Sequence, residues 1–132
     1  MISLDTNILV RFLVRDDEIQ FQKVLHFLQD LENNQKQAFI SLLVLIELNW
    51  VLSFRYKIAR QDIIHEMINL CHMPIFDIEH NKEVKQTLLY AQNNTFDLSD
   101  LLIACKSRSL DNLPVYTFDK KASRAEGFVL LP

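Results

Sequence analysis

Five acidic side chains stand at positions from which they could act together on one substrate. They directly follow predicted strands or lie near the start of predicted helices: Asp5, Glu47, Asp97, Asp100 and Asp119. Carboxylates brought to one place repel one another, and they persist as anions only around a cation. Because the donors are all oxygens, without His or Cys, the set selects a hard metal ion, Mg²⁺ or Mn²⁺. Such an ion polarises a bound water and lowers its pKa, which supplies a hydroxide nucleophile at neutral pH.

Glu47 is the acid that is hardest to explain by local structure. It lies in the apolar stretch 41–52, "SLLVLIELNWVL", which has helical character. On a helix, the side chains one turn away from it are all apolar: Leu43, Val44, Trp50 and Val51. No Lys or Arg lies within one turn, and a carboxylate in apolar surroundings is costly without a positive partner. We therefore expect Glu47 to lie away from any solvated face and to find its partner elsewhere in the fold or in solution.

The other four acids also have structural explanations. Asp97 is a good N-cap, and Asp100 in the first turn of the same helix would interact favourably with the helix dipole. Asp5 and Asp119 could cap the helical turns that follow them. The joint occurrence of all five acids favours the metal site over separate capping roles.

Elements that position these acids alternate along the chain. Strands are expected over five short apolar runs: 2–4, 37–40, 74–78, 115–118 and 128–131. Helices are expected over 6–14, 17–33, 42–52, 60–72, 81–93 and 98–110, with Asp17 and Ser41 as N-caps. Strands separated by one or two helices predict an α/β fold, a three-layer α/β/α sandwich with a central parallel sheet of about five strands. Ligands bind beyond the carboxyl ends of such strands, where the acids fall.

Composition narrows the class of protein further. The 132 residues predict one domain, and 49% hydrophobic with 23% charged residues is ordinary globular usage. The single glycine, Gly127, excludes Gly-rich phosphate loops, and a net charge of −3 means that nucleic-acid binding would need a local basic patch and a metal. Cys71 and Cys105 lack metal-ligand spacing and are expected to be buried, reduced thiols. With no secretion signal and no apolar run of about 20 residues, a cytoplasmic location is expected.

Four segments together resemble the PIN domain, and more narrowly the VapC-type toxin ribonucleases of bacterial toxin–antitoxin pairs. They are "LDTNILVRFL", "ISLLVLIELNWVL", "DLSDLLIA" and "TFDKKASR", in order and spread over nearly the whole chain. The resemblance implies Mg²⁺- or Mn²⁺-dependent cleavage of RNA, with transfer RNA or a ribosomal RNA loop as substrate. It also implies a homodimer that binds an antitoxin protein.

The resemblance assigns roles to individual residues. It places metal ligands at Asp5, Glu47, Asp100 and Asp119, and supporting positions at Thr6, Asn7, Asp97 and Thr117. Basic residues that flank the acids are candidates for contacts with RNA: Arg11, Lys120, Lys121 and Arg124. One departure is the "DLSD" segment, where the family often has a small residue and an aromatic around the acids.

Other classes with a similar order of elements match less well. A receiver domain needs an acidic pair after the first strand and a Lys after the last, but only Pro132 follows "FVLL". A haloacid-dehalogenase-like phosphatase needs two Asp around one residue, whereas residues 5–7 read Asp-Thr-Asn. A non-catalytic binding module with a PIN fold is a further alternative, but such a module would have no function for the acids that it retains. Within the enzyme class, a housekeeping RNA-processing nuclease is the alternative, and the small size favours the toxin.

Overall fold

Hydrogen bonding joins five short strands into two parallel sheets in the computed structural model, which describes residues 1–132. The first sheet has the order β1-β2-β3, and the second pairs β4 with β5. Their bounds are β1 (Ile2–Ser3), β2 (Ala38–Ile40), β3 (Phe76–Ile78), β4 (Val115–Thr117) and β5 (Phe128–Leu130). All pairings are parallel, with Ala38 opposite Phe76 in the first sheet and Val115 opposite Phe128 in the second. The α/β class, the five strands and their parallel direction are thus confirmed, but hydrogen bonds group the strands into sheets of three and two rather than into the one sheet that is expected from the sequence.

The chain forms two compact units, Met1–Glu79 and His80–Pro132. The first unit contains the three-stranded sheet and five helical segments. These are α1 (Thr6–Val14), α2 (Glu18–Asn33), α3 (Leu42–Trp50), the π-helix η1 (Val51–Arg55) and α4 (Arg60–His72). Two predicted caps are present: the side chain of Asp17 accepts from the Gln20 N–H at 3.0 Å, and Ser41 Oγ accepts from the Val44 N–H at 3.2 Å. The π-helix was not predicted from the sequence.

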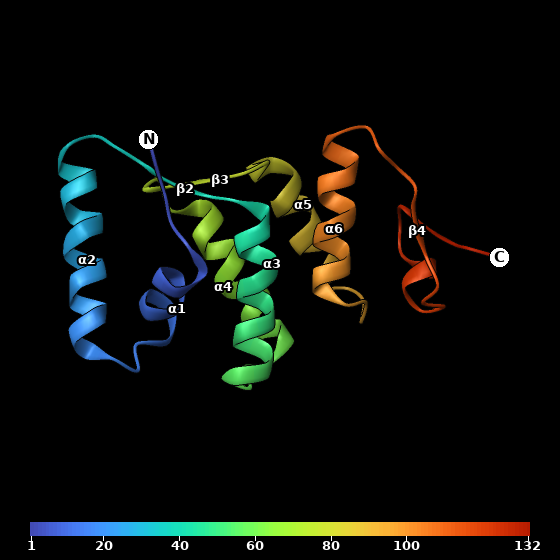
Figure 1. Ribbon diagram of the computed structural model, residues 1–132, viewed down its shortest axis with the longest axis horizontal. Helices are drawn as coiled ribbons and strands as arrows, with labels where there is room; N and C mark the ends of the chain where they lie inside the picture. Colours follow the sequence, from blue (N-terminus) through green and yellow to red (C-terminus); the bar gives the residue numbers. More distant parts are fainter. The chain divides into compact units, whose positions relative to one another are not determined.

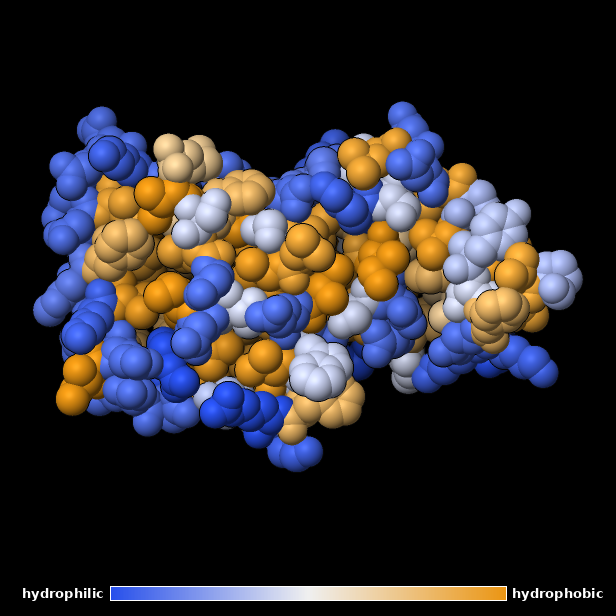
Figure 2. All heavy atoms as spheres, viewed as in Figure 1, coloured by the Kyte–Doolittle hydropathy of each residue, from blue (hydrophilic) through white to orange (hydrophobic).

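Apolar side chains hold the helices of the first unit together. α1 packs against both α2 and α3, and α4 packs against β3. Fully buried side chains from these elements form the core, among them Leu9, Ile40, Leu45, Leu48 and Met67. In Figure 2, apolar side chains also gather on the visible surface over α3, while the outer side of α2 is mostly hydrophilic. The face of α3 that does not pack into the core is therefore partly apolar.

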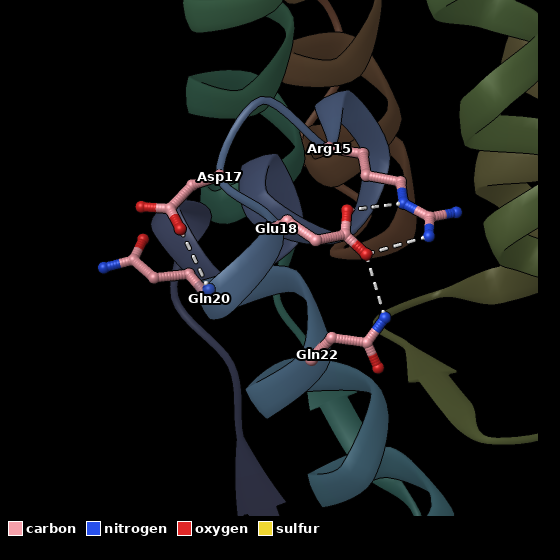
Figure 3. A network of polar contacts seen from close by, with 5 residues as sticks. All are labelled: Arg15, Asp17, Glu18, Gln20 and Gln22. Atoms are coloured by element: carbon pink, nitrogen blue, oxygen red, sulfur yellow. Dashed lines mark hydrogen bonds and ion pairs between the residues drawn. The ribbon is translucent and has the colours of Figure 1, made fainter.

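A polar network fixes the connection between α1 and α2 (Figure 3). Arg15, the C-cap of α1 with φ +56°, donates to Glu18 from both Nε and Nη2 at 3.0 Å. Hydrogen bonds from Arg15, and then from Gln22, lower the pKa of Glu18 to about 2. The Arg15 guanidinium also lies 4.2 Å from the ring centroid of Phe21. These contacts set the position at which α2 begins.

The second unit contains α5 (Asn81–Ala91), α6 (Leu98–Ser109), the 3₁₀ helix η2 (Ala122–Arg124) and the two-stranded sheet. α5 and α6 lie side by side (Figure 1) and bury Val84, Leu88 and Leu102. Gly127 has φ +87°, a conformation that L side chains rarely adopt, and its carbonyl accepts from the Val115 N–H at 2.7 Å. The turn before β5 therefore depends on this one glycine.

Two further expectations concern the thiols and the membrane. Cys71 and Cys105 are both buried, which confirms the expected burial. None of the helices has both the length and the apolar character needed to span a membrane.

Candidate metal-binding site

Asp5 lies at the carboxyl end of β1, as the sequence predicts for a ligand-binding position. The Leu4 N–H donates to the Phe39 carbonyl at 3.0 Å, so pairing with β2 continues up to this point. Asp5 is exposed and caps α1, because its Oδ1 accepts from the Ile8 N–H at 3.1 Å. Of the two polar residues that follow, Thr6 is buried and Asn7 is exposed.

Glu47 is exposed on α3, and the expectation that it avoids a solvated face is wrong. Its apolar neighbours Leu43 and Trp50 are themselves 78% and 62% exposed. The inner face of α3 is instead formed by Leu45 and Leu48, which are fully buried. Glu47 therefore carries no burial cost, although it still has no ion-pair partner in its unit. Its carboxylate is free to bind a cation from solution.

Two acids of the second unit, Asp97 and Asp119, act on a third, Asp100. Asp97 caps α6, since its Oδ1 accepts from the Asp100 N–H at 3.0 Å. Burial raises the pKa of Asp100, and the negative charges of Asp97 and Asp119 raise it further. The ionised form of Asp100 is therefore disfavoured, and a cation beside it would relieve both the desolvation and the repulsion.

Asp119 is held by its neighbours just after β4. Its N–H donates to Thr117 Oγ1 at 3.0 Å, and its Oδ1 accepts from the Ala122 N–H at 3.0 Å. Thr117 thus contributes to the position of Asp119, in keeping with its predicted supporting role. The caps made by Asp5, Asp97 and Asp119 each use one oxygen, and a carboxylate has about four lone-pair sites. Capping and metal binding are therefore compatible for all three acids.

The predicted metal ligands are divided between the two units. Asp5 and Glu47 belong to Met1–Glu79, and Asp100 and Asp119 belong to His80–Pro132. Neither unit on its own brings together three His, Cys, Asp or Glu side chains in a metal-binding arrangement. Burial, and then Asp97 and Asp119, raise the pKa of Asp100, and carboxylate oxygens of this kind are the donors that a hard divalent cation prefers.

The four candidate RNA-binding residues have different surroundings. Arg11 Nη1 forms an ion pair with Asp16 at 2.6 Å, and its side chain is only 19% exposed. Tyr56 adds to this network by donating to Asp16 Oδ2 at 3.2 Å. The other three, by contrast, are exposed around η2, next to Asp119: Lys120, Lys121 and Arg124. Contact of Arg11 with a phosphate would compete with its ion pair, whereas these three are accessible.

The order of elements and the acids at their ends define a class of protein. Residues 2–127 match the PIN domain, and the chain belongs to the PIN domain family. The chain is also similar to a VapC ribonuclease of Aquifex aeolicus (strain VF5). The two are 23% identical over 118 residues, which cover 89% of this chain and 87% of that protein. The resemblance to the PIN domain stated from the sequence is confirmed, and the similarity to a VapC ribonuclease agrees with its narrower part.

Proposed function

We propose that this protein is a metal-dependent endoribonuclease that acts as the toxin of a toxin–antitoxin pair. Membership of the PIN domain family and similarity to a VapC ribonuclease support a nuclease. The match to the PIN domain over residues 2–127 is the observation that carries the proposal. The raised pKa of Asp100 agrees with it, because a cation would stabilise this carboxylate. The family match also favours a PIN nuclease over a receiver-like module.

The four acids have distinct roles in the proposal. Asp5, Glu47 and Asp100 are the primary ligands of Mg²⁺ or Mn²⁺, and Asp119 binds a second ion or orients the attacking water. When bound, the cation supplies Lewis-acid activation of water and neutralises charge on the scissile phosphate. Asp97 and Thr117 hold Asp100 and Asp119 through the hydrogen bonds described above. We propose that residues 1–132 form one nuclease domain, which the PIN domain match over residues 2–127 supports.

Substrate contacts are proposed at three exposed cations that follow Asp119: Lys120, Lys121 and Arg124. Their charges would offset the net charge of −3 where the phosphate backbone approaches. Thr6 and Asn7 are proposed to support Asp5, and Arg11 is a weaker candidate for RNA contact. The proposed substrate is transfer RNA or a ribosomal RNA loop.

Incubation of the purified protein with total RNA tests the proposed activity. Cleavage is expected with Mg²⁺ or Mn²⁺ and not with EDTA, and the products should carry 5′-phosphate and 3′-hydroxyl ends because water is the nucleophile. Restoring activity by adding excess Mg²⁺ to the EDTA sample controls for damage by the chelator. Equal cleavage with and without EDTA would refute the metal role, and no cleavage under any condition would favour a non-catalytic module.

Association with other proteins is part of the same proposal. We propose a cytoplasmic homodimer that binds an antitoxin, with an antitoxin segment covering the acidic residues. Light scattering at micromolar concentration is expected to show a dimer, and the neighbouring gene product is expected to co-purify and inhibit cleavage. A protein that stays monomeric and does not bind this gene product would favour the housekeeping RNA-processing nuclease.

A further inference from the structure

Two aromatic rings are exposed side by side where α3 continues into η1. Trp50 and Phe54 are 62% and 58% exposed, and their ring centroids lie 5.0 Å apart with a tilt of 45° between the planes. We call this pair the Trp50–Phe54 platform. The fold does not need these rings, because the buried side chains of the same segment are Leu45, Leu48 and Leu52.

The platform shares a helix face with Glu47. Within α3, side chains three positions apart lie on the same side of the helix, so Trp50 follows Glu47 on one face, ~4.5 Å further along the axis at 1.5 Å per residue. Phe54 belongs to the π-helix η1, and its ring contact with Trp50 places it beside this face. The π-helical turn over Val51–Arg55, closed by the Tyr56 N–H bond to the Val51 carbonyl, is of a rare type that is often found at functional sites.

Positive charge flanks the platform. Between Glu47 and Asp62 the chain contains three cations and no further acid: Arg55, Lys57 and Arg60. Arg55 and Lys57 are exposed, immediately after Phe54. In a chain with a net charge of −3, this segment is a local region of positive charge that complements a polyanion.

We infer that the Trp50–Phe54 platform stacks unpaired bases of single-stranded RNA, while Arg55 and Lys57 contact the adjoining phosphates. The inference rests on the proposed nuclease function and specifies its substrate as unpaired RNA, held next to Glu47. Exposed aromatic rings beside cations are the combination that binds single strands, because every base has a π-face and every nucleotide a charge. Bases in a duplex are already stacked and would not fit this platform.

The same rings would also suit an apolar protein surface, and Leu43 on this face is 78% exposed. The cations Arg55, Lys57 and Arg60, which outnumber the flanking acids Glu47 and Asp62, favour RNA, since they give no advantage to an apolar partner. Association of two copies through this face is therefore an outcome that the experiment must separate from RNA binding.

Trp50 is the only tryptophan, so its fluorescence reports on the platform alone. We would titrate the whole protein in EDTA with a single-stranded oligouridylate, an abasic strand of equal length and a duplex of equal length. Quenching by the single strand is expected, with little by the other two. Phe54→Ala should weaken binding by roughly 5-fold or more, the range for loss of one stacking partner. Leu43→Ala is the matched control, because it truncates an even more exposed apolar side chain without a π-face, and it should bind as the wild type does.

A second readout separates charge from stacking. Replacing Arg55 and Lys57 by Gln should reduce the dependence of binding on salt concentration, because fewer phosphate contacts release fewer counterions. Equal quenching by the abasic strand, or unchanged binding in Phe54→Ala, would overturn the inference. Two results together would assign this face to a second copy and would also overturn the inference. The wild type would be a dimer whose fluorescence RNA does not quench, and Trp50→Ala would be a monomer. Because binding is measured without metal, its failure is distinguishable from a failure of cleavage.

Discussion

Asp100→Asn is expected to abolish RNA cleavage and to leave the protein folded with unchanged or higher stability. Asparagine keeps the shape of the side chain but removes the charge that the proposed metal requires. We expect a loss of at least ~10²-fold in cleavage rate, comparable to removing one group that stabilises charge in a transition state. Asp5→Asn should lose activity to a similar degree.

The expected gain in stability follows from the direction of the Asp100 pKa. Burial, and then the charges of Asp97 and Asp119, raise this pKa above its usual value. A carboxyl group with a raised folded-state pKa stabilises the fold at low pH, and this contribution is lost as the pH rises through the raised pKa. At neutral pH, without metal, the charge of Asp100 therefore opposes folding. Because water screens a half-buried group, we expect a gain of no more than ~1 kcal/mol in the free energy of unfolding.

Thermal melts in EDTA and RNA cleavage assays on the same preparations test this expectation. Glu32→Gln on the exposed side of α2 is a matched control, since it also removes one negative charge without a change of shape. Asp97→Asn is a second comparison, because asparagine caps helices as well as aspartate does. Full activity in Asp100→Asn would exclude Asp100 as a ligand, and clear destabilisation would assign it a structural role.

Mg²⁺ is expected to stabilise the wild-type protein and to have much less effect on variants that lack a ligand. A ligand that binds only the folded state at 100 times its Kd contributes ~2.7 kcal/mol. For a chain of this length, this corresponds to a rise in Tm of roughly 8–12 °C. Asp5→Asn, Glu47→Gln and Asp100→Asn should each reduce the shift.

In the same thermal melts, the exposure of Glu47 predicts how its two variants compare with each other. Because its side chain is exposed, Glu47→Ala creates no cavity, and it should melt like Glu47→Gln in EDTA. Both should respond weakly to Mg²⁺. NaCl at matched ionic strength controls for screening of surface charge. Equal shifts in the wild type and all variants would show that these acids do not bind the metal.

Local signals in the sequence determined the helices, the caps and the family. Asp17 and Ser41 begin their helices because a cap needs only a side-chain oxygen and the N–H groups three residues on. The parallel strands followed from helices between short apolar runs, and the acids at the carboxyl ends of β1 and β4 followed from the same order.

Only the tertiary structure decided which side chains are covered. The sequence places Glu47 in an apolar stretch, but whether that face meets the core or solvent depends on which elements pack on α3, and these are distant in the chain. The exposure of Trp50 and Phe54 has the same origin. The grouping of five strands into sheets of three and two depends on hydrogen bonds between distant segments. The raised pKa of Asp100 likewise needs burial and the charge of Asp119, which lies well beyond the end of α6 in the chain, because electrostatic interaction depends on distance in space.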